Sequence, residues 1–228
     1  MKMHISVIIP VFREQAVINE TIGALRRWPG GGDAEVIAVD GDAEGQTLAA
    51  IRDPAVRKVS SPKGRGVQQN RGAAAAAGDV LLFLHADTVL PPKAFDRISE
   101  AMRDEGCAGG AFDLHIDSPG AGFRAIERVA NLRSRWTRIP YGDQAIFIRT
   151  ACFRTLGGFQ EIPIMEDVDL MRRIKRKGWR IVIFREPVAT SARRWEKEGL
   201  LFCTLRNWSL MALYLCGVAP ERLARFYR

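Results

Sequence analysis

Three short, mostly apolar segments constrain the fold more than any other feature of the sequence. They are ISVIIPVF (5–12), EVIAVD (35–40) and VLLFL (80–84), and none alternates regularly between apolar and polar residues. Helical patterns separate them: Ile18, Ile22 and Leu25 share one face over 15–28, and an alanine-rich helix precedes Gly78. Apolar strands that alternate with helices are typical of a parallel sheet covered on both faces. We therefore predict an α/β fold with a mostly parallel central sheet.

The remaining segments extend the same pattern. VRKVS, GGAFDLHI, QAIFIR and WRIVIF are predicted strands, and residues 47–51, 120–136, 166–178 and 196–216 are predicted helices. The sequence contains no internal repeat, no low-complexity block and no long linker. We predict one domain over residues 1–195, followed by a helical extension, 196–228, that packs on the domain or in an interface.

Composition narrows the class of protein. The chain has 228 residues, of which 47% are hydrophobic and 26% charged, as in a globular protein. Its net charge of +8 suits an anionic partner: a nucleotide, a nucleic acid or an acidic membrane surface. The four cysteines form no C-x-x-C pair, so a thiolate metal site or a disulfide framework is not expected. We expect a cytoplasmic protein, at most peripheral at the inner face of a membrane.

Polar residues follow the predicted strands at three places. Asp40 ends one strand, the loop SPKGRG (61–66) follows another, and the tripeptide His85-Ala86-Asp87 follows VLLFL. In open parallel sheets, ligands bind beyond the carboxyl ends of the strands. The convergence of the three places predicts a binding site at that edge.

These motifs, in their order and spacing, resemble those of family 2 glycosyltransferases of the GT-A fold. The resemblance covers about residues 4–190 and depends on SVIIPVFREQAVINETI, EVIAVDG, GRGVQQNRGAAAAAGDVLLFLHADT, GGF and MEDVDLMRRIKRKGWRI. The segments LHADT and GDQAIFIR are similar to the small subgroup labelled radical-SAM/selenodomain-associated transferases. The resemblance implies a Rossmann-like sheet and an inverting transfer of sugar. The donor would be a UDP- or GDP-linked sugar, and the acceptor a hydroxyl or phosphate.

The resemblance also implies which residues bind the nucleotide. The loop after the first strand and the acid that ends the second would hold the base and ribose through Pro10, Phe12, Glu14 and Asp40. Asp40 has an alternative role as a turn former before Gly41. Lys63, Arg65 and Arg71 fall at the family's diphosphate or base contacts, since arginine binds phosphate bidentately. The alternative is a solvated basic loop and an exposed helix face.

His85-Ala86-Asp87 stands at the family's Asp-x-Asp metal motif. The resemblance implies that Asp87 binds Mg²⁺ or Mn²⁺ on the nucleotide phosphates and that Ala86 contacts the nucleotide. His85 replaces the usual first acid, so it either binds the metal or contacts ribose or phosphate. In the alternative, Asp87 caps a helix that begins at Pro91-Pro92.

Glu166-Asp167-Val168-Asp169 resembles the family's catalytic acids. Asp167 matches the general base, which takes the proton from the acceptor hydroxyl as its oxygen attacks the anomeric carbon. Ordinary capping of the helix is compatible with that role. Glu166 is expected at the substrate site. It shares one helical face with Asp169 and Arg173, which favours a structural role for Glu166 over that of a second catalytic base.

Two further segments are expected at the site. Asp143 and Gln144, in YGDQ, are candidates to hydrogen-bond sugar hydroxyls, and a plain turn is the alternative. Arg193, Arg194 and Trp195, in SARRW, fall where many relatives have a mobile loop that closes over the diphosphate. The alternative for this segment is a basic surface loop.

Two questions stay open at this level. The same scaffold could serve a non-catalytic nucleotide- or RNA-binding protein, although Asp87 and Asp167 together favour the enzyme, for which no nucleic-acid partner is expected. The C-terminal segment places apolar residues at helical spacing, at positions 201, 205, 208, 212 and 215. Such a face needs cover from its own domain, a second subunit in a homodimer or a membrane interface. Arg206 makes full insertion the least expected of these.

Overall fold

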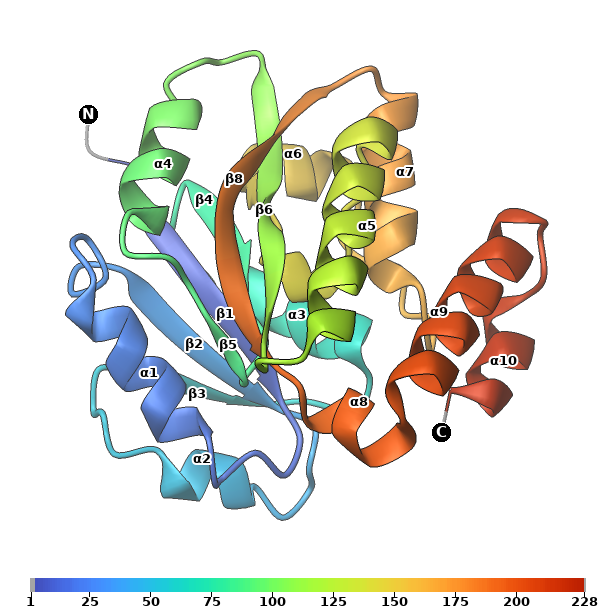
Figure 1. Ribbon diagram of the computed structural model, residues 1–228. Coiled ribbons are helices and arrows are strands. Elements are labelled where there is room, and N and C mark those ends of the chain that lie inside the picture. The colour runs from blue at the N-terminus through green and yellow to red at the C-terminus, as the bar shows by residue number, and fades with distance from the viewer. Residues whose placement is uncertain (1–2, 228) are drawn as a thin grey trace.

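The computed structural model describes residues 3–227. Within these residues, the strands form one sheet of eight in the order β3-β2-β1-β4-β7-β6-β8-β5, with helices on both faces (Figure 1). Its pairs are mostly parallel in the N-terminal half and mixed in the rest. The predicted α/β class is confirmed.

The N-terminal half contains the predicted strands nearly residue for residue. Strands β1 (Ile5–Val11), β2 (Glu35–Asp40), β3 (Val56–Ser60) and β4 (Val80–Phe83) are parallel. The crossovers run through α1 (Ile18–Arg27), α2 (Gln46–Ala50) and α3 (Arg65–Ala75). All four strands therefore end at the same edge, and the residues that follow them meet there.

The C-terminal half closes the sheet with mixed pairing. Strand β7 (Phe147–Arg149) is antiparallel to β4 and to β6 (Cys107–Asp117), whereas β6 is parallel to β8 (Arg180–Ser191), which pairs with the short β5 (Thr88–Val89). Connections contain α4 (Ala94–Ala101), α5 (Ala121–Thr137), the 3₁₀ turn η1 (Gly142–Gln144), α6 (Thr150–Thr155) and α7 (Glu166–Arg176).

Two predicted strands have different limits. QAIFIR is extended only from Phe147, because Gln144 belongs to η1 and Ala145 has a left-handed backbone with φ of 49°. WRIVIF continues to Ser191, well beyond its apolar part. The extension crosses Pro187 at an irregularity in the register with β6, where the ladder can tolerate a residue without an N–H.

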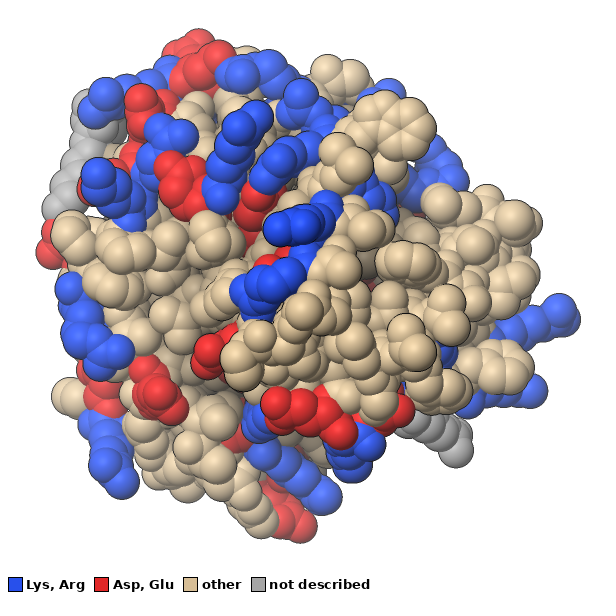
Figure 2. Space-filling view, viewed as in Figure 1, with Lys and Arg blue, Asp and Glu red and all other residues tan. Residues whose placement is uncertain are grey.

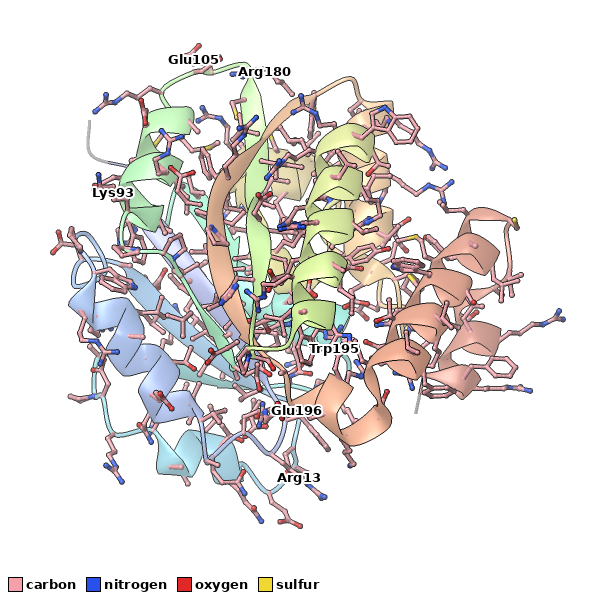
Figure 3. The ribbon with its side chains drawn as sticks, in the orientation of Figure 1. Arg13, Lys93, Glu105, Arg180, Trp195 and Glu196 are labelled. Atoms are coloured by element: carbon pink, nitrogen blue, oxygen red, sulfur yellow. The ribbon has the colours of Figure 1, made fainter. Side chains whose placement is uncertain are left out.

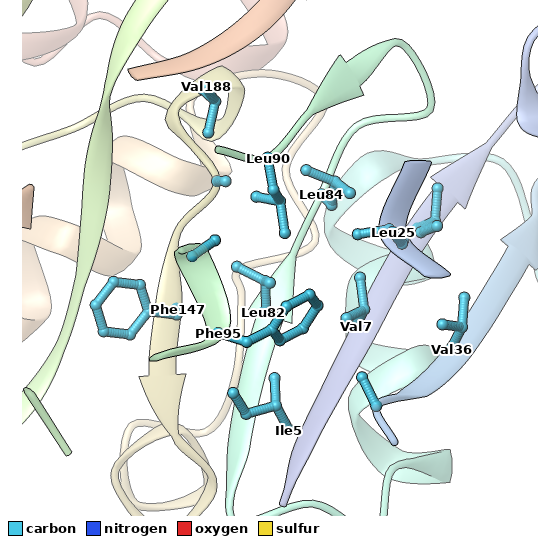
Figure 4. Packing of buried hydrophobic residues seen from close by; sticks show 14 of the residues in the cluster. Ile5, Val7, Leu25, Val36, Leu82, Leu84, Leu90, Phe95, Phe147 and Val188 are labelled. Carbon is cyan, nitrogen blue, oxygen red and sulfur yellow. The ribbon is translucent and has the colours of Figure 1, made fainter. Parts of the chain in front are cut away.

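Two hydrophobic layers hold the sheet between its helices. Val7, Leu82 and Phe147 face the layer that contains Phe95 of α4 (Figure 4). Ile8 and Phe83, their neighbours in sequence, face the opposite layer with α3, α6 and α7. Burial on both faces explains why these strands read as continuous apolar runs.

The predicted C-terminal helix is broken at Gly199, whose φ of 88° suits glycine. Helix α8 (Arg193–Glu198) precedes the break and α9 (Leu200–Leu215) follows it, and α10 (Pro220–Leu223) and η2 (Ala224–Phe226) complete the described chain. A small cluster around Ile164, Leu210 and Leu223 attaches α9 and α10 to the domain. Among residues 3–227, no helix combines the length and apolarity needed to cross a membrane.

The apolar stripe predicted on the C-terminal helix points away from the domain. Its members on α9 are all exposed: Leu201, Leu205, Trp208, Ala212 and Leu215. The face that packs inward is the one that contains Cys203 and Leu210. The domain therefore does not cover this stripe, so the first of the three alternatives does not apply.

Candidate active site

A cavity of about 560 Å³ opens at the carboxyl ends of β1 and β4. Strands β1 and β4 bring their C-terminal residues here because they are parallel neighbours. Most of the residues predicted for the site line it together: Pro10, Phe12, Glu14, Lys63, Arg65, His85, Ala86, Asp87, Asp143, Asp167, Arg194 and Trp195.

The loop after β1 forms one wall. The Lys63 ammonium lies 4.2 Å from the centroid of the Phe12 ring, a cation–π contact that places a positive charge over an aromatic face. Gln68 of α3 fixes this wall, since its Nε2 donates to the carbonyl oxygens of Val11 and Val39, each at 2.8 Å. Gln68 was not singled out from the sequence, and nothing in its context signals the role.

Five predicted contacts lie outside the cavity lining: Asp40, Arg71 and Gln144, described here, and Glu166 and Arg193, described below. Asp40 is fully buried, and its Oδ1 accepts the N–H of Asp42 at 2.9 Å, which is the turn role given as its alternative. Arg71 is exposed on α3, as its alternative predicted. Gln144 is buried, and its Nε2 donates to the carbonyl oxygen of Phe112 and to Ser134 Oγ. Its amide therefore stabilises η1 and leaves no group for a sugar hydroxyl.

Arg65 begins α3 rather than lying in a loop as predicted. Its Nη1 is 3.6 Å from Oε1 of Glu166, which is only 2% exposed and does not line the cavity. Burial raises the pKa of the Glu166 carboxyl, and the charge of Asp167 raises it further. Glu166 thus holds the side chain of Arg65 at the cavity and stands one layer behind it.

Asp87 and Glu14 share one cation. Nη2 of Arg193 lies 3.0 Å from Oδ2 of Asp87 and 3.4 Å from Oε2 of Glu14. Arg193 belongs to the first turn of α8, so this part of the predicted mobile loop is helical. Asp87 does not cap the helix after Pro91-Pro92, because α4 begins at Ala94 and has no side-chain cap.

His85 and Asp167 approach the same glycine. A Cβ at position 142 would lie 3.2 Å from Nε2 of His85 and 3.4 Å from Oδ2 of Asp167, a tight fit that would require the imidazole to shift by a few tenths of an ångström. Asp167 accepts the N–H of Gly142 at 2.6 Å through Oδ2. Burial, aided by Arg65, lowers the pKa of His85, so the imidazole is neutral at pH 7.

The residues present fit a divalent cation whose ligands come partly from the protein and partly from a bound phosphate. Within residues 3–227, no three His, Cys, Asp or Glu side chains are grouped to enclose a metal. Mg²⁺ and Mn²⁺ bound to nucleotides need only one or two carboxylates, because phosphate and water supply the other oxygens. Asp87 and Glu14 already bind a positive guanidinium between them, which marks the place as favourable for a cation.

The opposite wall comes from the C-terminal helices and η1. The guanidinium of Arg194 lies 4.0 Å from the Tyr227 ring centroid, and the Trp195 ring meets Phe123 of α5 edge to face at 6.3 Å. Figure 3 shows Trp195 on α8, near the N-terminal end of α5. Sequence reasoning did not assign lining residues from this wall: Tyr141, Asn207, Leu210 and Tyr227. Only Asn207 gave a signal, as a polar residue inside an apolar helix.

Four lining side chains carry a buried polar atom with no hydrogen-bond partner among the described residues. They are His85 Nε2, Asp143 Oδ1, Trp195 Nε1 and Asn207 Oδ1. Burial raises the pKa of Asp143 to about 6, and the charge of Asp167 adds to this. An unpaired buried polar group costs on the order of 1–3 kcal/mol. The cavity is therefore suited to a ligand with several hydrogen-bonding groups.

Comparison with known proteins gives one family. The sequence model of the family Glycosyl transferase family 2 matches residues 6–159, about two thirds of the chain. A dolichol-phosphate mannosyltransferase of Pyrococcus furiosus is 27% identical over 108 residues, which cover 45% of this chain and 31% of that protein. The chain thus matches about a third of the length of this relative. The crystal structure of S. aureus TarS resembles 99% of this chain and 42% of its own, with a TM-score of 0.62 and 16% identity, a likeness of fold alone.

Proposed function

Because the chain belongs to glycosyl transferase family 2, we propose that it transfers a sugar from a nucleotide-diphospho-sugar to an acceptor hydroxyl or phosphate, with inversion at the anomeric carbon. The observation that carries this proposal is the single cavity that Lys63, Asp87 and Asp167 line together. This cavity combines a cationic side chain that can contact a diphosphate, Lys63, with a carboxylate that can act as a general base, Asp167. Residues 1–195 would form the catalytic domain, and the extension 196–228 would add one wall.

The donor nucleotide would lie along the wall that Phe12 and Lys63 form. The Phe12 ring would cover the base or ribose, and the Lys63 ammonium, 4.2 Å from the ring centroid, would meet a phosphate oxygen. Arg65 and Arg194, which also line the cavity, would complete the cationic surroundings of the diphosphate.

Asp87, with Glu14 beside it, would hold the divalent cation. When bound, Mg²⁺ or Mn²⁺ neutralises negative charge on the leaving diphosphate. Arg193 now occupies both carboxylates, so its guanidinium must leave them before a cation can bind there. Once released, it is close enough to the cavity to contact the diphosphate itself.

Asp167 would act as the general base. Its Oδ2 is oriented by the N–H of Gly142, and its Oδ1 accepts the N–H of Val168 at 2.7 Å. These bonds direct the carboxylate into the cavity, where it can take the proton of an acceptor hydroxyl as the new C–O bond forms and the bond to the diphosphate breaks. The neutral His85, which approaches the same side of Gly142 as Asp167, cannot repel a cation near Asp87.

The acceptor and the subgroup are narrower proposals. The relative from Pyrococcus furiosus is named a dolichol-phosphate mannosyltransferase, so a lipid-linked phosphate is the first acceptor to test. The segments LHADT and GDQAIFIR support assignment to the radical-SAM/selenodomain-associated subgroup. Neither proposal is needed for the donor half of the reaction.

The donor half can be tested directly. UDP and GDP sugars are incubated with the full chain and Mg²⁺ or Mn²⁺, and release of the nucleoside diphosphate and thermal stabilisation by that diphosphate are measured. We expect metal-dependent stabilisation by one of the two bases, because a ligand that binds only the native state raises its stability. We also expect slow metal-dependent release, with water as acceptor.

Asp87→Ala should abolish the metal-dependent stabilisation, whereas Asp96→Ala, an exposed acid on α4, should keep it. Stabilisation without any release of diphosphate would instead indicate the binding protein on the same scaffold. Equal metal-dependent affinity in a folded Asp87→Ala variant would remove Asp87 from the site.

A further inference from the structure

Exposed large hydrophobic side chains are concentrated on one part of the surface. Among residues 3–227, eleven such side chains are exposed, and all except Val89 belong to α5, α9 or η2. The most exposed is Trp136 of α5, at 86%, and Leu201 of α9 follows at 75%. Single exposed apolar residues are ordinary, but a concentration of this kind marks an interaction surface.

The α9 part of this surface is a continuous stripe. Leu201, Leu205, Trp208 and Leu215 recur at the spacing of one helical face, and the opposite face packs inward through Leu210. Because the inward face is already engaged, rotation of α9 cannot bury the stripe without exposing the other side. The stripe therefore needs a partner outside the domain.

Helix α5 widens the stripe into a surface. Val129, Leu132 and Trp136 lie three and four residues apart, so they share one outward face. The two helices meet at their N-terminal ends, where a Cβ at Gly122 would clash with Leu200 (Figure 1). We call these exposed residues of α5 and α9 the apolar surface.

The charges around the apolar surface are mainly basic. Arg128 and Arg138, at α5, are exposed, as are Arg222 and Arg225 after α9, and Glu221 is the exposed acid in the latter segment. Helix α9 itself contains no Asp or Glu. In Figure 2, blue side chains gather over α5, and the face over α9 is largely uncharged.

We propose that the apolar surface docks the protein on the surface of an anionic lipid bilayer. Apolar and tryptophan side chains enter the boundary between head groups and acyl chains, while flanking arginines contact acidic head groups. Helix α9 has 16 residues, about 24 Å, so it lies in the plane of the interface and does not span the bilayer. A second copy fits less well, because it would bring two basic rims together in a chain of net charge +8.

Docking would place the cavity beside the lipid surface. Asn207 and Leu210, on the inner face of α9, line the cavity, and Leu205 and Trp208, on its outer face, belong to the apolar surface. One helix would thus separate the two. This inference concerns binding and goes beyond the proposed function: it stands even if no sugar transfer is found.

The test is sedimentation of the full chain with vesicles of phosphatidylcholine alone or mixed with phosphatidylglycerol. We expect binding to the mixed vesicles, weakened by added salt because surface charges are screened. A triple variant, Leu132→Ser, Trp136→Ser and Leu205→Ser, should bind roughly tenfold more weakly or worse. Val89→Ser, at an exposed apolar residue on β5 outside the apolar surface, should bind as the unmodified chain does.

Thermal unfolding of each variant verifies its fold, which exposed substitutions should leave intact. Light scattering without lipid should give a monomer. Failure to bind mixed vesicles, or binding unchanged in the folded triple variant, would overturn the proposal. So would a dimer that the triple variant dissociates, because a second copy would then be the occupant. Donor hydrolysis measured without vesicles reports on the proposed function separately.

Discussion

Oδ2 of Asp167 accepts a hydrogen bond from the backbone N–H of Gly142 at 2.6 Å, across 25 positions of sequence. The bond joins the first turn of α7 to η1 and directs the carboxylate into the cavity. A side chain at position 142 would enter the space that His85 and Asp167 leave. The proposed base is therefore oriented by a backbone N–H, at a position that no catalytic motif would have selected.

Asp167→Asn should keep donor binding and lose most of the turnover. An amide oxygen can still accept the N–H of Gly142, whereas the amide NH2 cannot accept the N–H of Val168, so the variant keeps the link to η1 and loses one local hydrogen bond together with the basic group. General-base catalysis contributes about 10²–10⁴-fold, and a fall of that size in diphosphate release is expected. The matched control is Asp169→Asn, which breaks only the pair with Arg173 on the same helix. Near-normal turnover in Asp167→Asn would reduce Asp167 to a structural role.

Arg193→Ala should raise the affinity for the metal and lower the affinity for the nucleotide. Removing the guanidinium leaves Asp87 and Glu14 without their shared counter-charge, so Mn²⁺ alone should bind roughly tenfold more tightly. The nucleoside diphosphate should bind more weakly, because one phosphate-binding cation is lost. Titration calorimetry measures both affinities. Lys197→Ala, an exposed base on the same helix, is the control, and unchanged Mn²⁺ affinity in Arg193→Ala would contradict the argument.

Asp143→Asn should change how stability depends on pH. Burial raises the pKa of Asp143 from 3.8 to about 6, so the folded chain holds this proton more tightly than the unfolded chain does. The contribution of the protonated Asp143 to the free energy of unfolding is fully present below about pH 4 and is lost as pH rises through 6. The variant never ionises, so relative to the unmodified chain it should gain about 2–3 kcal/mol between pH 4 and 7.

Urea unfolding of both chains at intervals over this range measures the difference. Asp96→Asn, at an exposed acid, should give a constant difference over the same range. If Asp143→Asn also gave a curve parallel to that of the unmodified chain, the buried carboxyl would not be holding its proton.

Sequence reasoning located the first half of the site because its signals are local. Asp87 follows an apolar strand and Asp167 lies in the first turn of a charged helix, so their places depend only on where parallel strands end and where α7 starts. The opposite wall depends on chain segments that meet after long separation. Tyr227 is 33 positions from Arg194, its hydrogen-bond partner, and no periodicity predicts that contact.

Local patterns also failed to give orientation. On α9, positions 201, 205 and 208 and positions 203, 207 and 210 follow the same helical period, so the pattern could not decide which face meets the domain. Gln144 illustrates the same limit in a turn. Its residue type suits a sugar hydroxyl, but the 3₁₀ turn directs the amide inward to Phe112.

Asn207→Leu should separate stability from function on the wall that the sequence did not assign. Asn207 Oδ1 is buried without a partner, and its Nδ2 reaches only the Cys203 sulfur, at 3.8 Å. Leucine has a similar shape and leaves no unpaired polar atom, so the free energy of unfolding should stay equal or rise by about 1 kcal/mol.

Sugar transfer should fall in Asn207→Leu, because in the unmodified chain the Asn207 amide can hydrogen-bond a hydroxyl group of the bound substrate. Losing one such bond predicts a roughly tenfold loss of transfer of labelled sugar to acceptors in a membrane extract. Thr204→Val is the matched control, because Thr204 lies on α9 outside the cavity lining and bonds only to the carbonyl oxygen of Leu200. A destabilised Asn207→Leu chain with full transfer would mean that the contact with Cys203 matters to the fold, and that the polar wall of the cavity does not include Asn207.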